Sequence, residues 1–200
     1  MTRIVFSLLF FLLLSAPAWA LSGRVVGVAD GDTITVLTAN KQQIKVRLYG
    51  IDCPEKKQAY GDRARDFTGA AVFGRDVQVE SLGRDRYGRT LGIVSGPSGR
   101  VLNRELLVNG LAWVYVQYCK RPECAKWSDD EAAARSARRG LWKQENPLPP
   151  WQWRKNRRGV ATTGEYSTRS MKGGSDENWG GRIGFTGMDS SRLCGGPNAV

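Results

Sequence analysis

The chain has 200 residues, of which 41% are hydrophobic and 24% charged, a balance typical of a globular protein with a core. Its 30 lysines and arginines outnumber its 19 acidic residues, so the formal charge is +11, and a polyanion is the expected kind of partner. The absence of histidine excludes Ser-His-Asp hydrolysis, H-E-x-x-H zinc sites and any chemistry with imidazole as base, which leaves carboxylates and a hard metal ion.

The first twenty residues have the pattern of a signal peptide. Arg3 supplies a short positive region, residues 4–14 are almost all apolar, and Ala18-Trp19-Ala20 is a small-x-small cleavage signal. We therefore expect export to the periplasm or the medium. The alternative is an uncleaved membrane anchor, which the short apolar run and Pro17 disfavour.

Runs of β-branched residues predict five short strands. Residues 24–28 and 33–37 flank a turn signal at Asp30-Gly31-Asp32, and residues 41–51 alternate between apolar and polar side chains. These three are expected to be consecutive antiparallel strands. Two more are expected at residues 76–81 and 90–95.

Helical spacing of apolar residues, or helix-ending signals, predict three helices. The first covers residues 58–73 and ends at Gly74, and the second covers residues 102–109 and stops at Gly110. Residues 128–131 (Ser-Asp-Asp-Glu) read as a capping box that opens the third helix, which Gly140 ends. Five strands and three helices predict the α+β class, with a small five-stranded barrel of the oligonucleotide-binding (OB) type and helices packed against it.

The composition changes after residue 148. We assign residues 1–20 to the signal peptide, 21–148 to the folded domain and 149–200 to a basic, glycine-rich, flexible tail. The stretch 151–158 combines tryptophans with basic residues. It either follows a nucleic-acid backbone and stacks on bases, or is a solvated basic segment whose tryptophans pack on the barrel.

The four cysteines are expected to be partly oxidised in an exported chain. Cys119 and Cys124 are close enough in sequence to bridge within one loop, and we favour that pairing. A zinc site is disfavoured because there is no C-x-x-C pair and Cys53 and Cys194 are far apart in the sequence.

Two clusters contain carboxylates. In Asp30-Gly31-Asp32 a tight turn can aim two carboxylates at a cation, although Asp-Gly is also a common hairpin turn. The second cluster has Arg47 on a strand and Asp52 and Glu55 just beyond its end, which is the composition of a phosphate-cleaving site. Carboxylate and carbonyl oxygens suit calcium. The alternative for this cluster is an ordinary surface ion pair.

A third cluster, at residues 85–89, brings Arg86, Tyr87 and Arg89 together. Two guanidinium groups can hold a phosphate in bidentate fashion, and Gly88 allows close approach. A charged hairpin turn is the alternative interpretation.

The strings ADGDT, VRLYGIDCPE and DRYGR, in this order, resemble the staphylococcal nuclease (thermonuclease) family. The resemblance extends over roughly residues 23–145 and includes the predicted helices. It implies that calcium is held by the carboxylates of Asp32 and Asp52 and by the backbone carbonyl of Cys53. It further implies that Glu55 orients or deprotonates the attacking water.

The same resemblance implies that Arg47 and Arg89 hold the scissile phosphate. Tyr87, Arg86 and Tyr115 are expected to contact the nucleotide, with Tyr118 as the alternative to Tyr115.

The function implied is an exported, calcium-dependent endonuclease that cuts DNA and RNA, works as a monomer and leaves 3′-phosphate ends. One alternative is a non-catalytic nucleic-acid-binding OB-type module. Another is a membrane-surface protein that uses its basic tail and a retained N-terminal segment.

Overall fold

A computed structural model describes residues 20–158 of the chain. The predicted signal peptide lies outside these residues except for Ala20, as do residues 159–200 of the predicted tail. Within the described part, no helix has both the length and the apolar character needed to cross a membrane.

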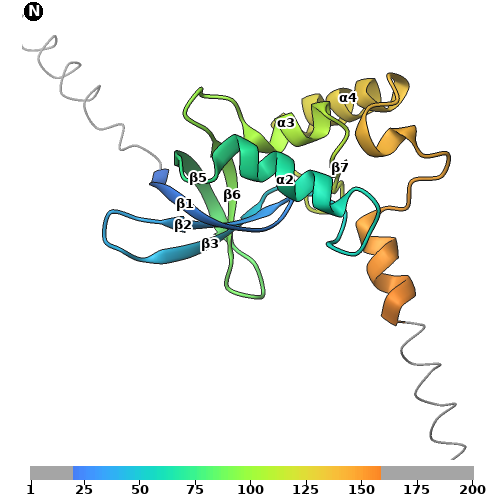
Figure 1. The fold of residues 1–200 in the computed structure, drawn as a ribbon. Helices are drawn as coiled ribbons and strands as arrows, with labels where there is room; N and C mark the ends of the chain where they lie inside the picture. Colours follow the sequence, from blue (N-terminus) through green and yellow to red (C-terminus); the bar gives the residue numbers. More distant parts are fainter. Residues whose placement is uncertain (1–19, 159–200) are drawn as a thin grey trace, which may run out of the picture. The chain divides into compact units, whose positions relative to one another are not determined.

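Five strands form a closed barrel (Figure 1). They are β1 (Ala20–Asp30), β2 (Thr33–Leu37), β3 (Gln43–Leu48), β5 (Asp76–Arg84) and β6 (Thr90–Ser95). Around the barrel the order is β1-β2-β3-β6-β5, and every pair is antiparallel except β3 with β6. This confirms the predicted five-stranded barrel and its three consecutive antiparallel strands.

The barrel interior is filled mainly by β-branched side chains. Val25, Ile34, Val36, Val46 and Val79 are fully buried. Such side chains favour extended backbone and pack well on a pleated surface, and closure of the sheet leaves them no route to water. The interior of the barrel is therefore filled by side chains, so a ligand is expected to bind at the rim of the barrel.

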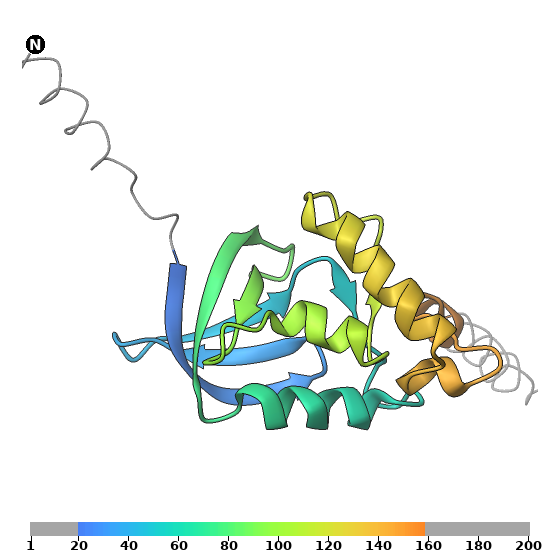
Figure 2. The ribbon, with the colours of Figure 1, turned by 90° about the horizontal axis from the view of Figure 1, so that it is seen from above.

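Helices cover one side of the barrel and extend beyond it (Figure 2). They are α2 (Gly61–Val72), α3 (Leu102–Val108), α4 (Glu123–Ser136), the 3₁₀ helix η1 (Gly140–Lys143) and an unlabelled helix at residues 150–158. Helix α2 contacts β1 and α3, whereas α4 contacts α3. The α+β class is confirmed, and residues 150–158 form a helix at the start of the segment assigned to the tail.

Helix α4 begins at Glu123, so the prediction that a capping box at Ser128 opens it is wrong. The Ser128 hydroxyl donates a hydrogen bond to the Cys124 carbonyl, as serine does inside a helix. The Glu131 carboxylate instead accepts a hydrogen bond from Val114 N at 2.7 Å. Both side chains therefore have partners other than a helix N-terminus.

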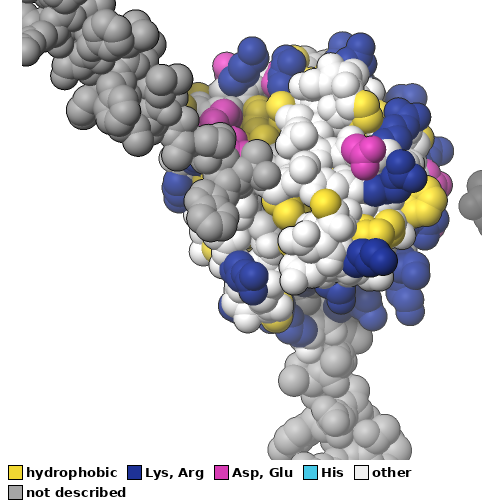
Figure 3. Space-filling view, turned by 90° about the vertical axis from the view of Figure 1, so that its left-hand side faces the viewer, with side chains coloured by type: hydrophobic (Ala, Val, Ile, Leu, Met, Phe, Trp, Pro, Cys, Tyr) yellow, Lys and Arg dark blue, Asp and Glu magenta, His cyan; other side chains and the backbone are white. Residues whose placement is uncertain are grey.

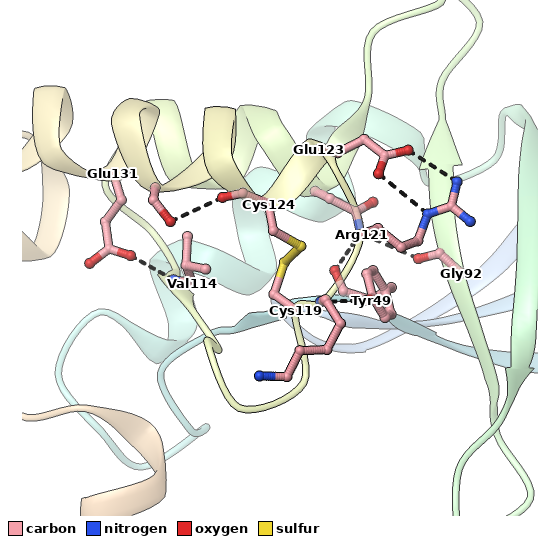
Figure 4. Close-up of a disulfide and its surroundings, with 11 residues drawn as sticks. Tyr49, Gly92, Val114, Cys119, Arg121, Glu123, Cys124 and Glu131 are labelled. Carbon is pink, nitrogen blue, oxygen red and sulfur yellow. Dashed lines mark hydrogen bonds and ion pairs between the residues drawn. A yellow bond between two sulfur atoms is a disulfide. The ribbon is translucent and has the colours of Figure 1, made fainter.

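A disulfide braces a second, two-stranded sheet of β4 (Ile51–Asp52) and β7 (Trp113–Val114). The predicted bridge between Cys119 and Cys124 is present, and it lies beside Tyr49, whose hydroxyl accepts a hydrogen bond from Lys120 N at 2.8 Å (Figure 4). Tyr115 N donates to Gly50 O at 2.8 Å. The strand that carries Asp52 is thus held by a segment about sixty residues further along the chain.

Candidate active site

Asp32, Arg47 and Asp52 meet at one end of the barrel. Arg47 Nη2 donates to Asp52 Oδ1 at 2.7 Å, and Arg47 Nη1 forms an ion pair with Asp32. The Asp52 side chain is only 1% exposed and that of Arg47 13%. A single buried guanidinium therefore holds together two carboxylates that lie twenty residues apart in sequence.

Asp32 is fixed by its backbone and by α2. Thr68, on α2, donates its hydroxyl to Gly31 O at 2.6 Å, and Leu48 N donates to Asp32 O at 2.8 Å. Cys53 N donates to Asp32 Oδ2 at 2.6 Å. A Cβ at Gly31 would meet the side chains of Ala64 and Cys53, so the turn packs too tightly for any larger residue.

Glu55 lies on a tight turn between β4 and α2. Gln58 N donates to Glu55 O at 2.7 Å, and Gln58 Oε1 accepts from Glu55 N at 3.1 Å. A Cβ at Gly61 would collide with Glu55 O, so the start of α2 packs directly on this turn. The Glu55 side chain is 38% exposed, whereas those of Asp32 and Asp52 are 6% and 1% exposed, so Glu55 is the most accessible of these three carboxylates.

Burial and crowding shift the ionisation of the buried acids. Burial, followed by the negative charge of Asp32, raises the pKa of Asp30 to about 7. Burial also raises the pKa of Asp52, and hydrogen bonds from Arg154 only partly oppose this. Burial works against the charged form of Arg47, but the charges of Asp32 and Asp52 outweigh it and hold its pKa above the ordinary value. The single guanidinium of Arg47 therefore interacts with three carboxylates, those of Asp30, Asp32 and Asp52.

The donor chemistry of this cluster fits a hard cation. Carboxylate oxygens dominate it, and calcium or magnesium prefers such ligands. No three Asp, Glu or Cys side chains of residues 20–158 converge into a complete metal cage, so backbone oxygen and water would have to complete the coordination. Arg47 Nη1 is buried, and its contact with Asp32 is an ion pair without hydrogen-bond geometry.

Arg154, from the helix at residues 150–158, reaches the same carboxylates. Its Nη2 donates to Asp52 Oδ2 at 2.7 Å, and its Nη1 donates to Glu55 Oε1 at 2.6 Å. Sequence reasoning did not identify this residue. The basic and aromatic composition of residues 151–158 was the available signal, but composition does not reveal a partner about a hundred residues away.

The third predicted cluster lies on the hairpin between β5 and β6. Arg89 Nε donates to Asp85 Oδ2 at 2.7 Å, and the guanidinium groups of Arg86 and Arg89 lie 4.8 and 5.5 Å from the centre of the Tyr87 ring. The Tyr87 side chain is exposed. Within residues 20–158 no described hydrogen bond or ion pair joins Arg89 to the Asp52 cluster.

The predicted nucleotide contact Tyr115 lies in an aromatic stack. Its ring is parallel to Trp151, with centroids 5.1 Å apart, and Tyr118 meets it edge-on at 4.7 Å. Tyr115 and Trp151 also line an open cavity of about 1150 Å³ together with Trp113 and Arg135. The cavity is large enough for a nucleotide, and it lies next to the carboxylate cluster through β7 and β4.

Comparison with known proteins decides the family. A family model described as "Staphylococcal nuclease homologue" matches residues 45–144, half of the chain. The chain belongs to the staphylococcal nuclease family. The matched range contains Arg47, Asp52, Glu55 and Arg89, whereas Arg154 lies outside it.

Relatives within the staphylococcal nuclease family include bacterial and plant proteins. The chain is 44% identical over 153 residues to "Micrococcal nuclease" of Shigella flexneri, covering 72% of this chain and 87% of the relative. It is 46% identical over 132 residues to an "Uncharacterized endonuclease" of Escherichia coli, covering 66% and 84%. It is 44% identical over 118 residues to "Staphylococcal-like nuclease CAN1" of Arabidopsis thaliana, covering 59% and 35%. The predicted family and enzyme class, a hydrolase of the nuclease type, are confirmed.

Proposed function

We propose that this chain is an exported, calcium-dependent endonuclease that hydrolyses phosphodiester bonds of DNA and RNA. The observation that carries the proposal is the buried Arg47, whose guanidinium joins the carboxylates of Asp32 and Asp52 at one end of the barrel. Family membership supports the reaction class, and the net charge of +11 suits a polyanionic substrate.

Asp32, Asp52 and the backbone carbonyl of Cys53 would hold the calcium ion. The carboxylates of Asp30, Asp32 and Asp52 all interact with the one guanidinium of Arg47. An irregular set of oxygen donors completed by water is the kind of site that calcium tolerates. When bound, the ion would supply positive charge to the phosphate under attack.

Glu55 is the proposed general base. It is more accessible than Asp32 and Asp52, so it can accept a proton from the attacking water molecule while these two stay buried. The Gln58 and Gly61 contacts keep its backbone in place, which gives the carboxylate a defined starting position.

Arg47 and Arg89 are the proposed phosphate ligands. The transition state of phosphoryl transfer carries more negative charge on its oxygens than the ground state, so fixed guanidinium groups lower the barrier selectively. Arg86, Tyr87 and Tyr115 are proposed to contact the nucleotide. Cutting at the bond to the 5′ oxygen, with 3′-phosphate products, and action as a monomer complete the proposal.

Hydrolysis assays on single-stranded DNA, duplex DNA and RNA test the proposal. Each is run with calcium, magnesium or chelator on the wild-type chain and on Arg47→Ala and Arg47→Lys. The control is Arg100→Ala, which removes an arginine that is 75% exposed. We expect cutting that requires calcium, is lost in both Arg47 variants and persists in the control. Binding without cutting under every condition would instead indicate a non-catalytic binding module.

A further inference from the structure

The helix at residues 150–158 places the guanidinium of Arg154 against the carboxylates of Asp52 and Glu55. Arg154 contacts both oxygens of Asp52, at 2.7 and 3.3 Å, and one oxygen of Glu55 at 2.6 Å. Asp52 is buried and Arg154 is 32% exposed, so the guanidinium covers the carboxylate from the solvent side. It thereby occupies lone pairs that a metal ion would need.

The position of Arg154 is supported by contacts on either side of it in sequence. Trp151 stacks on Tyr115 and packs against the cluster formed by Trp113 and Trp142. Just before the helix, Leu148 O accepts a hydrogen bond from Gln58 Nε2. Gln58 lies three residues after Glu55 in the sequence. The helix is therefore docked on the site through aromatic packing and through the turn that carries Glu55.

Arg154 and a divalent ion would each supply positive charge to the carboxylates of Asp52 and Glu55. Arg47 and Arg154 are the arginines that contact Asp32, Asp52 or Glu55 among residues 20–158. Arg47 is buried between its acids, whereas Arg154 belongs to the helix at residues 150–158, which is not part of the barrel. Local displacement of this helix would therefore leave the barrel closed.

We propose that Arg154 is a tethered cation that closes the metal site and that a divalent ion must displace it from Asp52 before the site becomes competent. This inference rests on the proposed role of Asp52 as a metal ligand. The apparent metal affinity is then the intrinsic affinity reduced by the fraction of molecules in which Arg154 is displaced. The released guanidinium remains close to the site, where an incoming phosphate can take it up.

Calcium titration by calorimetry, without nucleic acid, tests the displacement. The wild-type chain is compared with Arg154→Ala and with Arg157→Ala, which removes the same charge from an exposed position on the same helix. If Arg154 covers Asp52 nine-tenths of the time, Arg154→Ala should bind calcium about tenfold more tightly. Arg157→Ala should bind as the wild type does, because long-range charge alone changes little there.

Hydrogen exchange provides a second measurement that does not depend on activity. Saturating calcium should increase amide exchange in residues 150–158 of the wild-type chain, because the helix loses its contacts with Asp52 and Glu55. In chelator, Arg154→Ala should already show the faster exchange. Arg157→Ala should respond to calcium as the wild type does.

Equal calcium affinity in the wild-type chain and Arg154→Ala, or a helix whose exchange calcium leaves unchanged, would overturn the displacement model while the proposed calcium site survives. Loss of turnover in Arg154→Ala at saturating calcium, with unaltered affinity, would show that Arg154 serves the substrate instead. If no variant binds calcium or magnesium, the proposed metal site fails, and the inference fails with it.

Discussion

Glu55 is more exposed to solvent than Asp32 and Asp52, which is why we propose it as the general base. A substitution that removes only its basicity tests this role. Replacing Glu55 by glutamine preserves the shape of the side chain and removes its ability to accept a proton. A general base contributes typically about 10²- to 10⁴-fold, so turnover should fall by that amount. The thermal midpoint, measured beside the hydrolysis rate, should stay close to the wild-type value. Normal turnover by a folded Glu55→Gln chain would remove Glu55 from the mechanism.

Asn103 is a fully buried polar residue that holds three backbone groups. Its Oδ1 accepts from Val94 N at 3.0 Å, and its Nδ2 donates to Tyr49 O and Gly92 O at 3.0 and 3.3 Å. Asn103→Ala would remove the side-chain partner of Val94 N and Tyr49 O, whereas Gly92 O still accepts from Tyr49 N at 2.8 Å. We expect a loss of about 2–4 kcal/mol in the free energy of unfolding.

Urea denaturation measures this loss, with Asn109→Ala as the control. Asn109 is exposed, and its side chain donates to Glu105 O within its own helix turn. Its replacement should change the free energy of unfolding by at most about 0.5 kcal/mol. Comparable losses in the two variants would mean that the buried network does not stabilise the fold.

Helix α2 supplies a matched pair of glycines with opposite surroundings. A Cβ at Gly61 would collide with the Glu55 backbone, whereas a Cβ at Gly69 meets nothing within 4 Å. Gly61→Ala should cost about 1–3 kcal/mol and reduce turnover, because the Glu55 turn must move. Gly69→Ala should stabilise the chain by about 0.5–1 kcal/mol, as alanine does inside a helix. Thermal melts and initial rates of both variants check this, and equal behaviour of the two would contradict it.

The disulfide between Cys119 and Cys124 closes a loop that follows β7, the strand paired with Asp52. For so short a loop the chain-entropy estimate is roughly 2 kcal/mol. We expect reductant to lower the urea midpoint of the wild-type chain accordingly. The Cys119→Ala/Cys124→Ala variant should start from the lower value and show no response to reductant. A response in that variant would assign the effect to something other than the bridge.

Local patterns were sufficient to predict the barrel. The β2 and β6 bounds match the predicted residues because their alternation and β-branched content are properties of the strands themselves. Strands β4 and β7 have two residues each, too few for any period, and they pair only through tertiary structure. The start of α4 was misassigned because Ser128 and Glu131 mimic a cap while they bond to other groups.

The candidate site could be predicted in part because several of its residues lie in short sequence motifs. Asp32, Arg47, Asp52 and Glu55 belong to short motifs, and the structure brings them together. The contact of Arg154 with Asp52 depends on how the helix at residues 150–158 docks, and no local pattern encodes that docking.

The excess positive charge is a property of the whole molecule. On the face drawn in Figure 3, lysine and arginine side chains lie mainly around the edge and gather on the right, and acidic side chains are few. Substrate binding should therefore depend strongly on salt. For single strands, log K falls with log salt by about 0.7 per phosphate contacted, so three contacts imply a roughly twentyfold loss between 50 and 200 mM.

Fluorescence anisotropy with labelled single-stranded DNA measures this slope, with Glu55→Gln in calcium to prevent cutting. Arg47→Ala in the same background should reduce the slope of log K against log salt by about 0.7, the contribution of one phosphate contact. Affinity that does not change with salt would contradict an electrostatic mode of binding.

The pairing of β4 with β7 also fixes when the site can assemble during synthesis. A ribosome releases Asp52 about sixty residues before Trp113, its partner in the sheet, and about a hundred residues before Arg154. A nascent chain that stops between Ser95 and Trp113 has all the strands of the barrel but lacks the strand that pairs with Asp52. The acidic centre is therefore among the last parts of the described fold to be completed. Its full set of contacts can form only after nearly all of the described residues have been translated.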